Sequence, residues 1–113
     1  MTEKTYKPVL ISSITPKTNI KKCRFIGFDG NYCTANAKAY GVADVDTDME
    51  DMLPVGLIGI LLVETGGAVT VGAKITSDSE GRAVVVSDSE ECNGYALDEA
   101  SAAGEFIRII RGI

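Results

Sequence analysis

Histidine and tryptophan are both absent from this 113-residue sequence, and aromatic residues make up only 6% of it. Without histidine, the sequence lacks the usual base of Ser-His-Asp and Cys-His systems and a common zinc ligand. No paired set of catalytic carboxylates can be recognised either. We therefore expect no enzymatic activity, no cofactor and no metal. A core of Val, Ile, Leu and Ala favours β-structure over an aromatic-lined ligand pocket.

Cysteine is scarce, and its spacing matches no known metal or redox motif. The three cysteines, Cys23, Cys33 and Cys92, form no C-x-x-C pair, and an odd number cannot all pair within one chain. We expect buried thiols. Their redox state stays open.

Long apolar runs and basic stripes are also missing. The longest apolar window, residues 53–63, is about half of a membrane span and contains Pro54, Gly56 and Gly59. The first 15 residues lack the layout of a signal peptide. A net charge of −5 would repel a nucleic-acid backbone. We expect a soluble protein made in the cytoplasm, with neither membrane nor nucleic acid as partner.

What the sequence does contain is a series of short strand-like runs separated by turn residues. In residues 66–86, an alternating run at 69–73 and an apolar run at 83–86 flank a polar turn at 77–81. Asp29-Gly30 predicts a second hairpin. Seven or eight strands with a turn every 8 to 12 residues or so predict an all-β fold, a small barrel or sandwich with at most one or two short helical turns.

The N-terminal residues differ from the rest, so we expect an extended arm at residues 1–19 and a β-domain at residues 20–113. Pro8 cannot donate a ladder hydrogen bond at its own nitrogen, which limits this run to an edge strand or a mobile arm. Such a segment is a candidate for adding itself to the sheet edge of a partner. The candidate partner-binding residues are Tyr6, Lys7, Pro8, Val9, Leu10 and Ile11.

Residues 57–63 are apolar on both faces of the predicted strand. Such a strand is either central in a sandwich or small barrel, or has its second face covered by another subunit. The candidate self-association residues are Leu57, Ile58, Ile60, Leu61 and Leu62.

Two further features offer an alternative function, a carrier or ligand-binding module. Lys74 lies near a glycine turn, as do modified lysines of biotinyl and lipoyl domains, but it sits within a strand pattern. The acidic loop at residues 44–51 repeats Asp at every second position, yet Met49 stands where a calcium-binding EF-hand loop needs glycine. The Lys74 region also misses the phosphate-binding P-loop pattern, because Ala73 separates Gly72 from the lysine.

The order of several motifs resembles a family of small phage capsid decoration, or cement, proteins, whose members are sometimes mislabelled as RecA/RadA-like recombinases. The matching motifs are RFIGFDG at residues 24–30, YGVA at 40–43, GGAVTVG at 66–72, TSDSEGRAV at 76–84, GYAL at 94–97 and AAGEFIRI at 102–109. Together they cover roughly residues 20 to 110. Each motif is turn-plus-strand chemistry, and the specificity lies in their joint order.

This resemblance implies a tulip-like β-domain on the outer surface of a phage head, usually as trimers, that locks the capsid against internal pressure. It also implies that the arm reaches the major capsid protein by strand addition. The acidic stretch at 44–51 and the following residues 52–54 depart from the family pattern, in which we expect a smaller and less charged turn. We predict a virion structural protein that decorates and stabilises the capsid and forms a homo-oligomer, with a trimer as the expected assembly.

Overall fold

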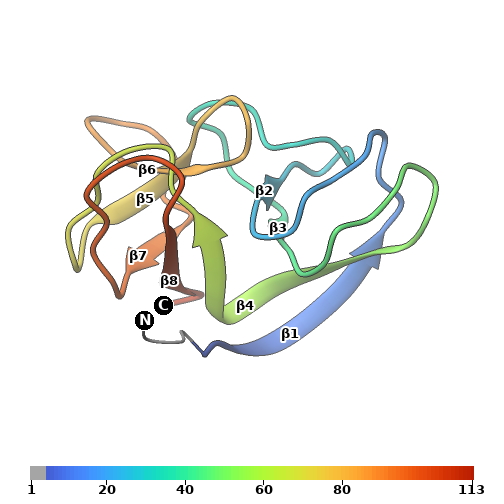
Figure 1. Cartoon of the computed structure of the whole chain (residues 1–113), viewed down its shortest axis with the longest axis horizontal. Coiled ribbons are helices and arrows are strands. Elements are labelled where there is room, and N and C mark those ends of the chain that lie inside the picture. The colour runs from blue at the N-terminus through green and yellow to red at the C-terminus, as the bar shows by residue number, and fades with distance from the viewer. Residues whose placement is uncertain (1–4) are drawn as a thin grey trace.

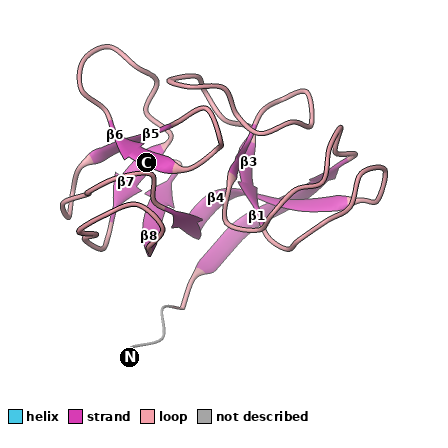
Figure 2. Cartoon of the chain, turned by 45° about the horizontal axis from the view of Figure 1, so that its top comes forward, coloured by secondary structure: helices cyan, strands magenta, loops and turns pink. Residues whose placement is uncertain are grey.

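The computed structural model describes residues 5–113, and within this range all regular structure is β-strand. The first four residues of the predicted arm lie outside the described residues. The strands are β1 (Lys7–Ile14), β2 (Phe25–Ile26), β3 (Gly41–Ala43), β4 (Leu53–Glu64), β5 (Lys74–Ser77), β6 (Ala83–Val85), β7 (Gly94–Ala96) and β8 (Phe106–Arg111). Loops of varied length connect them (Figure 2). The described chain contains no helix that could span a membrane.

The strands form one antiparallel sheet that curls into a nearly closed barrel. Its order is β2-β3-β4-β8-β7-β5-β6, with β1 paired to β4 outside this path (Figure 1). The two ends of the sheet approach each other, because the Phe25 amide donates to the Gly81 carbonyl at 2.6 Å and Thr65 forms a parallel bridge with Ala83. The prediction of a small all-β barrel is confirmed.

The longest strand, β4, pairs on both of its edges and bends sharply in Figure 1. One edge pairs first with β3 and then with β8, while the other edge pairs with β1. Gly59 stands where these pairings meet, with a φ of 118° that side chains rarely adopt. A β-carbon there would lie 2.6 Å from the Lys7 carbonyl oxygen and from the Val9 amide nitrogen. Only glycine lets the β1 backbone approach so closely.

Two apolar clusters fill the interior, and β4 contributes to both. Leu61 and Val63 belong to the larger cluster inside the barrel, whereas Leu53 and Val55 belong to the smaller one. Ile14 of β1 packs against the smaller cluster. The buried side chains near the two ends of β4 therefore tie the barrel to the layer that carries β1.

The sequence located most turns correctly, but two predicted strands are absent: the one at 69–73 and the one after Asp29-Gly30, where only a single bridge joins Ile26 and Tyr32. The Asp29-Gly30 turn is present, as is the turn at 78–81 between β5 and β6. The predicted strand at 69–73 was wrong. The Ala73 amide donates to the Thr70 carbonyl at 3.2 Å, and Gly72 has a φ of 85°, so these residues form a turn and the strand begins at Lys74.

β4 begins at Leu53, four residues before the two-faced apolar run predicted at 57–63. Pro54 is tolerated within the strand, where it pairs with Ser13, because it still offers its carbonyl, which accepts the Asp44 amide at 3.0 Å. The acidic residues 44–51 form a loop, as predicted.

Pro8 occupies a position in β1 where its missing N–H does not weaken pairing with β4. The Lys7 carbonyl and the Val9 amide both face Gly59 of β4. All peptide bonds in the described chain are trans, so the Pro8 nitrogen, on the opposite side of its peptide plane from the Lys7 oxygen, faces away from β4.

We predict that Val9→Pro lowers the free energy of unfolding by about 1–3 kcal/mol, because it removes a donor that faces β4. Pro8→Val should change stability by no more than about 0.5 kcal/mol. Urea denaturation of both variants measures the difference. Equal stability of the two variants would show that β1 does not pair with β4 in this register.

We also predict that only one thiol reacts in the folded protein. Cys23 and Cys33 are buried, whereas Cys92 is partly exposed. Burial raises the pKa of the Cys23 thiol to about 11 and also raises the pKa of Cys33, which disfavours their reactive thiolates. Mass spectrometry after iodoacetamide treatment at pH 8, at a concentration low enough to keep the protein monomeric, should show one adduct, on Cys92, and three after unfolding in urea. Modification of Cys23 in the folded state would contradict this packing.

Candidate functional site

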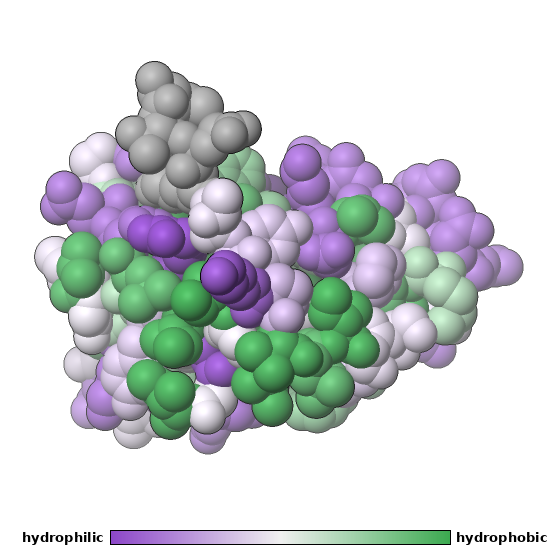
Figure 3. All heavy atoms as spheres, turned by 90° about the horizontal axis from the view of Figure 1, so that it is seen from below, coloured by the Kyte–Doolittle hydropathy of each residue, from purple (hydrophilic) through white to green (hydrophobic). Residues whose placement is uncertain are grey.

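The first candidate surface is β1, which exposes a run of apolar side chains. Val9 is 79% exposed, and Leu10 and Ile11 are each about half exposed. These side chains remain in solvent because β1 lies outside the barrel path and pairs with β4 alone. Contiguous exposed apolar residues are typical of an interaction site. Figure 3, which views the side of β1 and the bend of β4, shows hydrophobic residues gathered on this face.

The outer edge of β1 has no strand partner among residues 5–113. Two register irregularities interrupt its pairing with β4, one between Pro8 and Leu10 and one between Leu10 and Ile11. Bulges and edge prolines are features by which proteins limit uncontrolled strand addition. The edge is unpaired and can accept a partner strand. The Pro8 ring limits the register in which that strand can pair.

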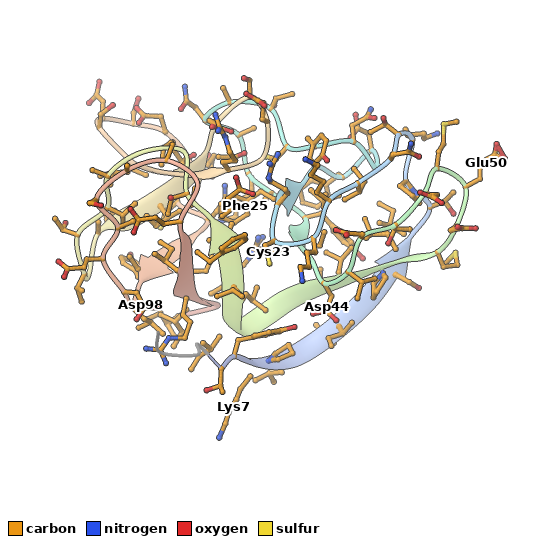
Figure 4. The ribbon with its side chains drawn as sticks, viewed as in Figure 1. Lys7, Cys23, Phe25, Asp44, Glu50 and Asp98 are labelled. Carbon is orange, nitrogen blue, oxygen red and sulfur yellow. The ribbon has the colours of Figure 1, made fainter. Side chains whose placement is uncertain are left out.

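Tyr6 and Lys7 lie at the start of this strand. The Tyr6 hydroxyl donates a hydrogen bond to Asp44 Oδ1 at 3.0 Å, and this bond is the largest cause of a raised Tyr6 pKa. The contact fixes the start of β1 to the segment that follows β3. Lys7 is exposed and pairs with Ile60 in the ladder (Figure 4). All six predicted partner-binding residues thus lie together on one strand or directly before it.

The predicted self-association residues separate into two groups. Leu61 is only 3% exposed and packs inside the barrel, so its side chain is occupied by the chain's own core. Leu57, Ile60 and Leu62 are half-buried, and Ile58 is exposed. The two-faced apolar pattern of this strand reflects its central position in the sheet, with pairing on both edges.

A groove of about 360 Å³ opens beside β1, between β4, β7 and β8. Its apolar lining includes Leu10, Leu57, Ile58, Tyr95 and Ile110. Three of these residues belong to the predicted partner-binding and self-association sets, so the structure brings parts of both sets to one place.

Two basic side chains also line the groove, and neither was predicted from the sequence. Lys38 Nζ donates to the Cys92 carbonyl at 2.8 Å, and Arg111 Nη2 donates to the Ala39 carbonyl. The buried Asn93 side chain accepts from the Ala39 amide and donates to the Ala37 carbonyl, both at 2.9 Å, which fixes this wall. Lys38 and Arg111 are far apart in sequence, so no local motif could have identified them.

The features behind the alternative function lie elsewhere. Lys74 is exposed at the first position of β5. In the acidic loop, Asp44 accepts the Tyr6 hydroxyl and Asp46 accepts the Lys22 amide at 2.8 Å. No group of three or more His, Cys, Asp or Glu residues within the described chain could hold a metal ion.

Comparisons with known proteins agree with this architecture. The head fiber gp8.5 N base of bacteriophage phi29 has a similar crystal structure, with a TM-score of 0.73 and 25% sequence identity over 91% of this chain and 95% of that chain. No curated protein sequence matches. The profile of the phage cement proteins matches residues 4–111, which is nearly the whole chain. The chain therefore belongs to the phage cement protein family and is a head-associated structural protein.

Proposed function

We propose that this protein decorates the outer surface of a phage head and stabilises the capsid by binding the major capsid protein through β1. The observation that carries the proposal is the open, apolar outer edge of β1, which stands outside a barrel that is otherwise nearly closed. Membership of the phage cement family supports a structural role on the phage head. The likeness to a phage head fiber base supports attachment at the head.

Strand addition is the binding mode that suits this edge. A partner strand alongside β1 gains main-chain hydrogen bonds, while exposed Val9 and Ile11 supply side-chain contacts that select the partner. Because β1 already pairs with β4, the partner strand extends an existing sheet. Binding then does not require this protein to order a free N-terminal arm. This preorganisation lowers the entropic cost of binding.

Many copies on one head would strengthen individually weak contacts. When a copy has bound the shell, a neighbouring copy on the same shell is present at high effective concentration. The contact between the two copies then forms more readily. We propose that the surface around exposed Ile58 and half-buried Leu57 makes the contact between copies, with a trimer as the expected assembly. Leu61 and the buried part of β4 then serve only the fold.

We expect the double variant Val9→Lys with Ile11→Lys to bind phage heads at least about tenfold more weakly than the native protein. It removes two apolar contacts at the proposed interface, while both side chains are exposed in the free domain. Binding is measured by cosedimentation with heads that lack this protein.

Val71→Lys is the matched control, since Val71 is an exposed valine (65%) in the turn before β5. It should bind heads as the native protein does. Thermal unfolding of all three proteins establishes that they are folded. Undiminished binding by the double variant would overturn β1 as the attachment strand. Failure of the native protein to bind heads would overturn the decoration function itself.

A further inference from the structure

We propose that the loop at residues 45–52 of one copy docks into the groove of a second copy. This inference rests on the self-association included in the proposed function, and it identifies the two complementary surfaces. The groove is the one lined by Leu10, Leu57, Ile58, Lys38 and Arg111. Its occupant is the loop at residues 45–52, which contains most of the acidic stretch at 44–51. Attachment through β1 gives this loop no role.

The groove carries positive charge that no acidic side chain in its lining balances. Lys38 and Arg111 contribute the two charged side chains of its lining. Arg111 Nη1 is buried and has no hydrogen-bond partner in the described part of the chain. Burial lowers the Arg111 pKa, which reflects a charge held away from water. In a protein of net charge −5, this groove is a local basic site that favours an acidic occupant.

The loop offers the matching chemistry. Val45, Met49 and Met52 are each about half exposed or more, and they alternate with acidic residues. Its exposed carboxylates are those of Asp46, Asp48, Glu50 and Asp51. Apolar side chains would fill the groove while carboxylates approach the two cations. Methionine suits such a site because its flexible side chain fills irregular surfaces.

The loop is already shaped before it binds. The Ile20 amide donates to the Thr47 carbonyl at 2.8 Å, and the Thr47 amide donates back at 2.9 Å. The Met49 amide donates to Asn19 Oδ1 at 2.9 Å. Glu50 has a φ of 76°, which turns the chain sharply at the tip. Little ordering is therefore needed on association.

The loop and the groove lie on different sides of the molecule. Figure 4 shows Glu50 at the end of the domain remote from β7 and β8, which help to form the groove. A copy therefore cannot fill its own groove with its own loop. Contacts of this head-to-tail kind join unlike surfaces, and they close into a ring when the rotation between copies permits.

Charge reversal tests the pairing. Glu50→Lys with Asp51→Lys should weaken self-association at least about tenfold in sedimentation velocity measured over a range of concentrations. Lys38→Glu should weaken it as well. One chain that carries Glu50→Lys, Asp51→Lys and Lys38→Glu again has opposite charges on loop and groove. It should recover most of the lost association.

The charge-matched controls are Glu99→Lys with Asp88→Lys for the loop variant and Lys74→Glu for Lys38→Glu, since all three residues are exposed and lie outside loop and groove. They should associate as the native protein does. Thermal unfolding checks that each variant is folded.

Alkylation of Cys92, which lines the groove, reports directly on its occupancy. Cys92 should be protected in the native oligomer and reactive in the Glu50→Lys, Asp51→Lys variant. A native protein that stays monomeric at all concentrations would overturn the inference, as would unchanged association of the loop variant. Protection of Cys92 only on phage heads would also overturn it, because the shell would then fill the groove. Binding of the native protein to heads is measured separately by cosedimentation. That measurement tests the decoration function independently of self-association.

Discussion

Pairing along both edges of β4 is the constraint on which the rest of this structure depends. One edge joins β3 and β8 and thereby carries the barrel, while the other edge holds β1 outside it. Gly59 permits the close approach of β1 at the point where the pairings with β1 and β8 meet. The protein thus has a compact barrel, stabilised by its own core, and one added strand whose outer edge is open.

This division separates stability from function. The buried side chains of β4, such as Leu61 and Val63, fill the barrel and leave nothing for a partner. The exposed side chains of β1 contribute little to the core, so they can serve binding without a large cost to folding. The groove beside β1 places basic and apolar residues from five separate segments around one opening. Both proposed contacts, to the shell and to a second copy, therefore use surfaces that the fold does not need for itself.

The sequence predicted the fold class because turn chemistry is local. Asp29-Gly30 and the turn ending at Gly81 each form within a few residues, so their residue types identify them without knowledge of the rest of the chain. The strand predicted at 69–73 was wrong because alternation alone cannot distinguish a strand from a turn that places valine in solvent. The positive φ of Gly72 turns the chain there. The family resemblance, built on the order of these motifs, is confirmed.

The site was less accessible to sequence reasoning. The apolar run at 9–11 identified a candidate strand, but its pairing with β4 depends on a contact between residues about 50 positions apart. Lys38 and Arg111 meet only through the barrel, so neither stands out in the sequence. Leu61 was indistinguishable from Ile58 by composition, although one lies in the core and the other at the surface. Burial is a property of the whole fold, which explains why residue type alone could not separate them.

The most direct test of this account is an electron cryomicroscopy reconstruction of phage heads decorated with the protein. The account predicts that β1 remains paired with β4 and that a strand of the major capsid protein lies along the outer edge of β1. A reconstruction in which the protein contacts the shell through the β5–β6 hairpin, with the outer edge of β1 facing solvent, would contradict it.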